Sequence, residues 1–209
     1  MQTAVRRRPV QRRSVERFER ILDSCAELLD DVGFSGLTTK EVARRARVPI
    51  GTLYQFFPGM DGLLRSLAQR NLATYNGRLA RRIEADRPED VGALVDLAVE
   101  EYVAMHRTTP GFGVVDFGAV VRDGEQGGAG AGGGHALEAL LGSRSPDADL
   151  VWACATGLLA GSSRRHPRIA LRIALECAGA VLRLAFRHDP DGDPVLIAEC
   201  RLLIRGYLS

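Results

Sequence analysis

The chain has 209 residues, of which 45% are hydrophobic and 26% charged, as is ordinary for a globular protein of one or two domains with a sizeable core. It contains no apolar run approaching the ~20 residues that cross a bilayer, which excludes a membrane-spanning protein. Residues 1–70 carry 13 Arg or Lys against 8 Asp or Glu, whereas the remainder carries 15 against 18. A basic first part on an acidic body indicates that the first part meets a polyanion, although an ordinary solvated surface gives the same count.

The cysteines and the first residues indicate the compartment. Cys25, Cys154, Cys177 and Cys200 lie far apart among apolar residues, with no C-x-x-C pair, so we expect small core residues in a reducing cytoplasm. The basic residues of the first segment are not followed by an apolar run, so no signal peptide is expected. We expect neither a metal site nor a cofactor.

Residues 1–13 are expected to form a disordered basic arm, which either lies along DNA or has no role. A helix is then expected to begin near Ser14 and to end at Gly33. Its apolar residues follow the i, i+3, i+4, i+7 pattern of a helix with one buried face. They are Phe18, Ile21, Leu22, Cys25, Leu28, Leu29 and Val32.

Two short helices are predicted next, joined by a tight turn. Thr38 is expected to cap the amide of Glu41, and Glu41 to reach back to the amide of Thr38. Pro49 ends any continuous helix and suits the first turn of a second one, which runs over residues 50–57. Two such helices form a helix-turn-helix, whose second helix enters the major groove of DNA.

The stretch TTKEVARRARVPIGTLYQFFPGMDGLL resembles the DNA-binding signature of the TetR family of transcriptional regulators, and GTLYQFF is its most specific part. The resemblance covers roughly the first third of the chain. It implies an all-α protein, with a three-helix helix-turn-helix domain over residues 14–75 and a helical effector-binding and dimerisation domain over residues 76–209. Arg47 stands where the family usually has a turn glycine, Pro49 where it has a capping serine, and Met60 where a lysine is common.

Specific side chains of the helix-turn-helix suit contact with DNA. The hydroxyl of Tyr54 can bind a phosphate, Gly51 lets the backbone come close, and the amide of Gln55 can read adenine in the major groove. Ile50 can touch a thymine methyl group. The residues expected to contact DNA are Thr38, Lys40, Arg45, Ile50, Gly51, Thr52, Tyr54 and Gln55.

The rest of the chain predicts further helices and no confident strand. A long amphipathic helix through residues 63–83 would link the two domains mechanically. Residues 112–121 could form a short helix or a strand. The other predicted helices span residues 86–107, 135–141, 147–163, 169–187 and 195–208.

The body is expected to hold a pocket for a small apolar or aromatic effector. The candidates for its wall are Tyr102, Met105, His106, Phe112, Phe117 and Trp152. Each of these could equally be an ordinary core residue.

A homodimer is expected to form through residues 147–163 and 169–187, because the second of these helices is apolar around much of its circumference. The alternative is that residues 169–187 form the central helix of a monomeric domain.

The resemblance implies a repressor released from a palindromic operator by a small molecule, and a transcriptional activator of the same fold is the alternative. A helical enzyme or a structural adaptor would also be compatible with an all-α chain. The four histidines are scattered, without metal-ligand spacing such as H-E-x-x-H, and no residues nominate a catalytic centre.

Overall fold

A computed structural model of the chain describes residues 8–115, 145–160 and 166–209. Within these ranges the protein is built from eight helices and contains no strand, which confirms the predicted all-α class. Their bounds are Arg8–Val32 (α1), Thr39–Arg45 (α2), Ile50–Phe56 (α3), Met60–Asp86 (α4), Val91–Thr108 (α5), Pro146–Leu159 (α7), Pro167–Ala185 (α8) and Pro194–Leu208 (α9).

Helix α1 begins at Arg8, so the predicted start near Ser14 is wrong, and residues 8–13 of the predicted disordered arm are helical. Pro9 does not prevent this, because proline is tolerated in the first turn of a helix. Arg12 and Glu16, one turn apart, form an exposed ion pair of 3.1 Å that also suits a helix. At the other end, Gly33 has a φ of 67°, which confirms its predicted role as the helix stop. Residues 1–7 of the predicted arm lie outside the described part.

The α2–turn–α3 unit forms largely as predicted. The hydroxyl oxygen of Thr38 accepts a hydrogen bond from the amide of Glu41 over 3.2 Å. The Glu41 carboxylate does not reach back to Thr38 but accepts a hydrogen bond of 2.9 Å from the Arg44 guanidinium, which lowers its pKa. In the turn, Arg47 adopts a φ of 55°, the left-handed conformation that glycine takes most readily.

The first three helices and the start of α4 share one hydrophobic core. Leu53 of α3 and Phe57 after it are fully buried there, beneath Phe18 of α1, whose ring stacks on Phe57 at 5.0 Å between centroids. An ion pair at the edge of this core adds to the packing. Arg45 of α2 lies 2.6 Å from Asp31 at the end of α1, and this contact joins the two helices.

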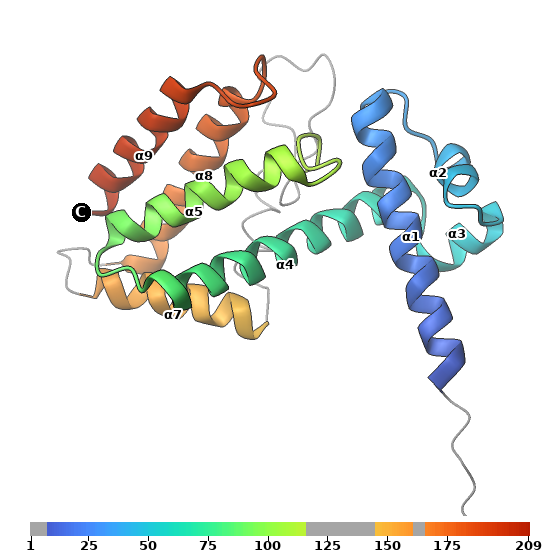
Figure 1. The fold of residues 1–209 in the computed structure, drawn as a ribbon, viewed down its shortest axis with the longest axis horizontal. Coiled ribbons are helices and arrows are strands. Elements are labelled where there is room, and N and C mark those ends of the chain that lie inside the picture. The colour runs from blue at the N-terminus through green and yellow to red at the C-terminus, as the bar shows by residue number, and fades with distance from the viewer. Residues whose placement is uncertain (1–7, 116–144, 161–165) are drawn as a thin grey trace, which may run out of the picture.

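Helix α4 runs from this unit into the second part of the molecule, the body, where it packs against α5 and α7, and α9 lies on the far side of α5 (Figure 1). Its residues up to Ala68 belong to the first core and those from Tyr75 onward to a second core. The packing therefore changes between Ala68 and Tyr75, shortly before the division predicted after residue 75. One continuous helix is thus shared by both parts of the chain.

The segment after α5 returns to the first unit. Its described residues form turns up to Val114 and an isolated β-bridge at Val115. The prediction of a helix or strand over residues 112–121 lies mostly outside the described part, which ends at Val115. The carbonyl oxygen of Val115 accepts a hydrogen bond from Asn71 of α4 over 2.7 Å, and Val115 is itself part of the first core. The segment and α4 are therefore two separate connections between the body and the head, which is the unit formed by α1, α2, α3 and the start of α4.

None of the described helices combines the length and the apolar character that crossing a bilayer requires.

Candidate functional site

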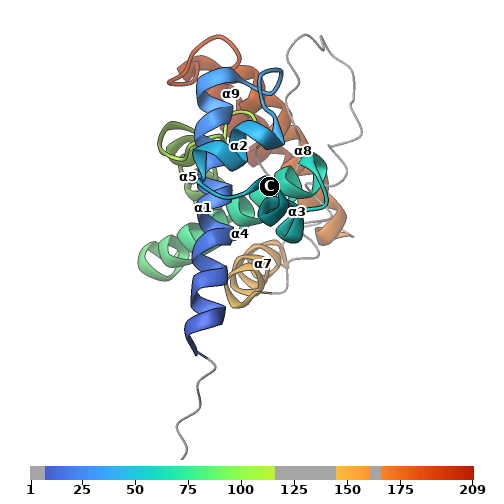
Figure 2. The same cartoon turned by 90° about the vertical axis from the view of Figure 1, so that its right-hand side faces the viewer.

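Helix α3 lies on the side of the molecule that Figure 2 turns toward the viewer. Ile50 and Tyr54 are 42% and 53% exposed, although both are large side chains, and Gly51 and Gln55 are also exposed. Thr52 is half-buried. Because Leu53 anchors the helix from below, these side chains project from a fixed support. A short helix held in this way suits insertion into a groove.

Helix α2 supplies the neighbouring edge of the same face. The Tyr54 hydroxyl and Thr39 Oγ1 lie 3.1 Å apart and share a hydrogen bond between α3 and α2. Thr38 and Lys40, on either side of Thr39, are exposed. The sequence did not single out Thr39, because a threonine in the first turn of a short helix carries no pattern that distinguishes it.

Arg45, predicted to contact phosphate, is directed to α1 instead. Its guanidinium lies 2.6 Å from Asp31 and 3.9 Å from Glu27, and the side chain is 29% exposed. A phosphate contact of Arg45 would compete with this ion pair, and it stays a prediction. Arg47 in the turn is exposed, and it lies between the two helices that carry the predicted DNA contacts.

The first half of α1 carries a line of basic side chains. Arg13, Arg17 and Arg20 are exposed and spaced by four and three residues, which places them on one side of the helix. The beginning of α1 projects beyond the other helices of the head (Figure 1). The three arginines are therefore exposed on the part of α1 that extends beyond α2 and α3.

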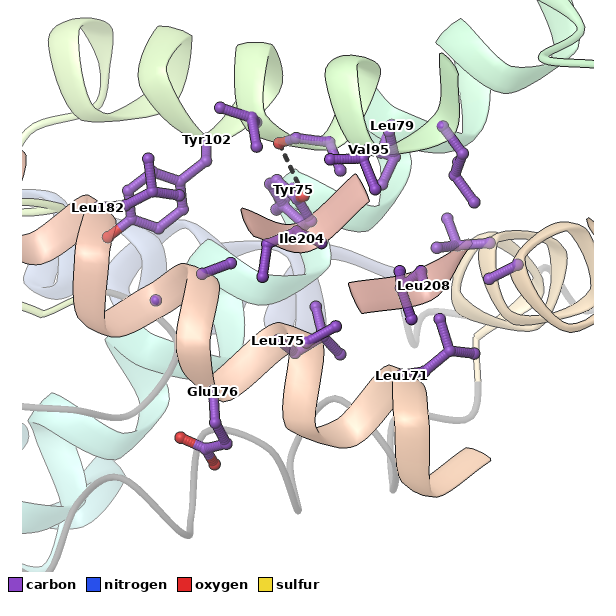
Figure 3. Close-up of a pocket in the computed structure, with 18 of the residues that line it drawn as sticks. Tyr75, Leu79, Val95, Tyr102, Leu171, Leu175, Glu176, Leu182, Ile204 and Leu208 are labelled. Carbon is purple, nitrogen blue, oxygen red and sulfur yellow. Dashed lines mark hydrogen bonds between the residues drawn. The ribbon is translucent and has the colours of Figure 1, made fainter. Parts of the chain in front are cut away.

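In the body, a cavity of about 160 Å³ lies among α4, α5, α7, α8 and α9 (Figure 3). Its wall is mostly apolar, and it lies against the first turns of α5, up to Tyr102. Residues that line it include Tyr75, Leu79, Val95, Tyr102, Trp152, Leu171, Leu175, Leu182, Ile204 and Leu208.

A few polar groups occur in this wall. The Tyr75 hydroxyl donates a hydrogen bond to the carbonyl oxygen of Ala98 over 3.0 Å, and burial raises the pKa of that hydroxyl. Asn76 is 1% exposed, and its Nδ2 has no hydrogen-bond partner among the residues that the structure describes. Glu176 and Arg183 are the charged residues among the described lining.

Two of the residues predicted for an effector pocket, Tyr102 and Trp152, line this cavity. Met105, His106 and Phe112 do not line it, because the cavity follows α5 only as far as Tyr102 and these three residues lie beyond that point. Met105 and Phe112 are fully buried in the body core. Phe117 lies outside the described residues.

His106 is packed among aromatic rings. It stacks on Phe186 with 3.6 Å between ring centroids, and its ring meets that of Phe112 edge to face at 6.1 Å. Burial lowers the pKa of His106, because the apolar surroundings disfavour its charged form. It is thus a core histidine rather than a residue of the pocket wall.

Exposed apolar side chains gather on α8 and α9. On α8, Ile169, Ile173 and Leu184 are 55%, 43% and 42% exposed. On α9, Val195, Leu202 and Leu203 are 66%, 62% and 51% exposed. Within each helix these residues recur at spacings that keep them on one face, and the two helices pack side by side. Several large apolar side chains exposed on neighbouring helices indicate an interaction surface.

Comparison with known proteins identifies the family. The sequence model of "Bacterial regulatory proteins, tetR family" matches residues 21–67, and that of "Tetracyclin repressor-like, C-terminal domain" matches residues 148–209. The crystal structure of a TetR-family transcriptional regulator from Streptomyces coelicolor is 37% identical, with a TM-score of 0.72, covering 92% of this chain and 97% of that one. The chain belongs to the TetR family.

Curated relatives match over shorter regions. The HTH-type transcriptional regulator BetI 1 of Chromohalobacter salexigens is 33% identical over 92 residues, which are 42% of each chain. The HTH-type transcriptional repressor KstR of Rhodococcus jostii is 38% identical over 63 residues, or 30% of each chain. The chain therefore spans less than half of the length of the curated relatives that it matches.

Membership in the TetR family indicates which functions the chain has. TetR-family proteins are DNA-binding transcriptional regulators, mostly repressors, that dimerise and are typically not enzymes. The region matched by the first sequence model contains α2, α3 and the turn between them, and that matched by the second contains α8 and α9.

Proposed function

We propose that this protein is a repressor that binds a palindromic operator as a homodimer and leaves it when a small molecule occupies the cavity. The exposed face of α3, held on a fixed support, is the observation that carries the DNA-binding part of the proposal. The mainly apolar cavity beside α4 supports the effector part. An activator of the same fold would use the same surfaces. A regulator of this kind works in the cytoplasm, where the chromosome is.

Each exposed residue of the helix-turn-helix has a distinct role in this proposal. Gln55 reads a base edge, Ile50 contacts a thymine methyl group, and Gly51 and Thr52 approach the backbone. Tyr54 binds a phosphate through a hydroxyl that Thr39 holds in place. Thr38 and Lys40 on α2 contact phosphates, and Arg45 is left out because it pairs with Asp31.

The basic side of α1 extends the same interface. Arg13, Arg17 and Arg20 would follow the phosphates outside the groove that α3 enters, each adding a salt-sensitive contact. In this proposal the contact with DNA, which was one of the two alternatives for the basic arm, is made by a helix rather than by a disordered segment.

The dimer interface is proposed on α8 and α9. The apolar face of these helices supports this choice, since its side chains are left without cover in one protomer. Helix α7, predicted to share the interface, packs against α4 instead, and no large apolar side chain of its described residues is strongly exposed. Two helices from each protomer then form a four-helix bundle.

Release from DNA requires that a ligand in the cavity changes the position of α3. Two parts of the chain that contact both the body and the core beneath α3 support this coupling. Helix α4 contributes Tyr75 and Leu79 to the cavity and Leu63 and Leu67 to the core beneath α3. The segment after α5 adds a second route through Val115. A ligand shifts the protein away from DNA only if it binds the DNA-incompetent arrangement more tightly.

The proposal is tested by selecting duplexes from a random pool with the purified protein. We expect an inverted repeat whose half-sites are centred about 34–36 Å, or a multiple of it, apart along the DNA. Gln55→Ala should relax the preference at one base of each half-site by about 1–3 kcal/mol. A bound pool without any repeated sequence would contradict the proposal.

Tyr54→Phe and Thr39→Val separate the two roles of the Tyr54 hydroxyl. The first variant removes the phosphate contact and should weaken binding to all duplexes equally. The second keeps the hydroxyl but removes its hydrogen-bond partner, so it should weaken binding less. If both variants bind like the wild-type protein, Tyr54 has no part in the interface.

A further inference from the structure

The cavity wall contains a polar group whose hydrogen-bonding capacity is not used within the described protein. Asn76, on α4, lines the cavity and is 1% exposed. Its Nδ2 finds no partner among the residues that the structure describes. Buried amide donors in native proteins are nearly always hydrogen-bonded, because an unpaired one loses its contacts with water without replacement. A donor of this kind beside a cavity indicates that a ligand supplies the acceptor.

The charges of the wall limit the ligand. Glu176 and Arg183 both belong to α8, and the remaining described lining residues are neutral. Figure 3 shows the Glu176 side chain pointing away from Tyr75 and Ile204, which lie on the inner side of the cavity. A charged group placed deep among Tyr75, Leu79 and Val95 would lose its hydration and gain no counter-charge. The inner part of the cavity therefore favours a neutral molecule.

The volume limits the ligand further. An engineered apolar cavity of about 150 Å³ in another protein binds benzene. The cavity here, of about 160 Å³, is comparable, so it takes a compact molecule of about one ring with a short substituent. The Tyr75 hydroxyl already donates to Ala98, whereas Asn76 Nδ2 is the buried side-chain donor of the described lining that has no hydrogen-bond partner.

We propose that the cavity binds a neutral, mainly apolar molecule of about one ring that carries a single oxygen acceptor, to which Asn76 Nδ2 donates a hydrogen bond. This inference rests on the proposed function, because it names the chemical class of the effector. It assigns Asn76, rather than the aromatic residues of the wall, as the group that orients the ligand.

The test uses three ring compounds of similar shape and calorimetric titration of the full-length protein. Cyclohexanone offers a carbonyl oxygen, methylenecyclohexane replaces that oxygen with a CH₂ group, and cyclohexanecarboxylate adds a charge. Asn76→Leu keeps the size of the side chain and removes its N–H groups. The ratio of the cyclohexanone affinity to the methylenecyclohexane affinity should fall about three- to tenfold in the variant, as for one hydrogen bond.

A folded Asn76→Leu variant is required for the comparison, and urea denaturation provides the check. We expect its midpoint to be equal to or above that of the wild-type protein, because the substitution removes an unpaired buried amide. Should the variant fail to fold, Asn76→Ala, which also removes the N–H donors and adds no charge, replaces it with the same expected fall in the ratio.

Three results would overturn the inference. These are an unchanged affinity ratio in the variant, binding of cyclohexanecarboxylate as tight as that of cyclohexanone, and no binding of any of the three compounds at millimolar concentration. The titrations contain no DNA, so they are independent of the proposed function. If cyclohexanone binds through Asn76 but leaves DNA affinity unchanged, the ligand class stands and the effector role of the cavity fails.

Discussion

The backbone amide of Gly111 donates a hydrogen bond to Oδ1 of Asp30 over 2.8 Å and so ties the segment after α5 to helix α1. The two chains approach closely at this point: a Cβ on Gly111 would lie 2.9 Å from the backbone of Ala26, and the φ of Gly111 is 71°. Both the space and the backbone conformation therefore call for glycine. This contact fixes the segment that follows α5 against α1.

Asp30→Ala and Asp30→Asn test what this contact contributes. Alanine leaves the Gly111 amide without its acceptor, and we expect the free energy of unfolding to fall by about 1 kcal/mol. Asparagine keeps an acceptor oxygen. It also removes a negative charge near the C-terminal end of α1, where burial already raises the pKa of Asp30, so it should match or exceed the wild-type stability. Urea denaturation measures both; equal losses in the two variants would show that the charge matters rather than the hydrogen bond.

Arg47→Gly should stabilise the protein, because Arg47 has a φ of 55° in the turn between α2 and α3. The left-handed conformation costs a non-glycine residue about 1–2 kcal/mol, and the added freedom of glycine in the unfolded chain offsets about 0.5–1 kcal/mol of that gain. We expect a net increase of roughly 0.5–1 kcal/mol in the free energy of unfolding.

Arg44→Gly is the control for Arg47→Gly. It makes the same chemical change inside helix α2, where glycine is unfavourable by about 1 kcal/mol, so stability should fall. Thermal unfolding of both variants gives the two signs. A loss of stability in Arg47→Gly would mean that the turn does not carry the strain described here.

His106 gives the protein a pH-dependent stability. Burial lowers its folded-state pKa below the unfolded value of 6.5, so protonation favours the unfolded chain. The stabilisation is complete above pH 6.5 and is lost as the pH falls toward the lowered pKa, with a slope of at most about 1.4 kcal/mol per pH unit.

His106→Phe keeps an aromatic ring against Phe186 and cannot be protonated. Urea denaturation at pH 7.5 and pH 5.5, chosen as roughly one unit on either side of the ordinary histidine pKa, should show a smaller difference for the variant than for the wild-type protein. An identical difference in both proteins would assign the pH dependence to other groups.

Leu202→Glu should convert the dimer into a monomer. Leu202 is 62% exposed on α9, so the substitution costs little in the isolated protomer, but a dimer would bury its charge. Light scattering should report half the wild-type mass, and operator binding should weaken strongly because the two half-sites are no longer bound together. Val32→Glu, at a residue 46% exposed on α1, is the control and should remain dimeric. A dimeric Leu202→Glu protein would contradict the proposed interface.

The helix-turn-helix was predictable because its signals are local. Thr38 caps the amide three residues later, and Pro49 precedes the next helix, so each boundary depends on neighbouring residues. The partner of Glu41 was not predictable in the same way, because Arg44 competes with the Thr38 amide for the same carboxylate. The early start of α1 was missed because residues 8–13 lack apolar periodicity, which helix formation does not require.

The cavity and the proposed dimer surface depend on which helices pack together, and a single sequence does not specify this packing. The apolar residues of α7 were recognised, but they face α4, whereas those of α9 are left exposed. Asn76 gave no signal at all, since an asparagine on a long amphipathic helix is most often a surface residue. Tyr102 and Trp152 were found because large aromatic residues commonly line pockets.

The central claim, that α3 reads DNA sequence, is tested most directly by measuring the affinity of the dimer for its selected duplex and for a scrambled duplex over a range of salt concentrations. We expect the selected duplex to bind at least about 10³-fold more tightly at physiological salt, and Gln55→Ala to reduce that ratio. For both duplexes, log affinity should fall with log salt concentration, with each neutralised phosphate contributing about 0.9 to the slope. Equal affinity for the two duplexes, together with no effect of Gln55→Ala, would contradict the account.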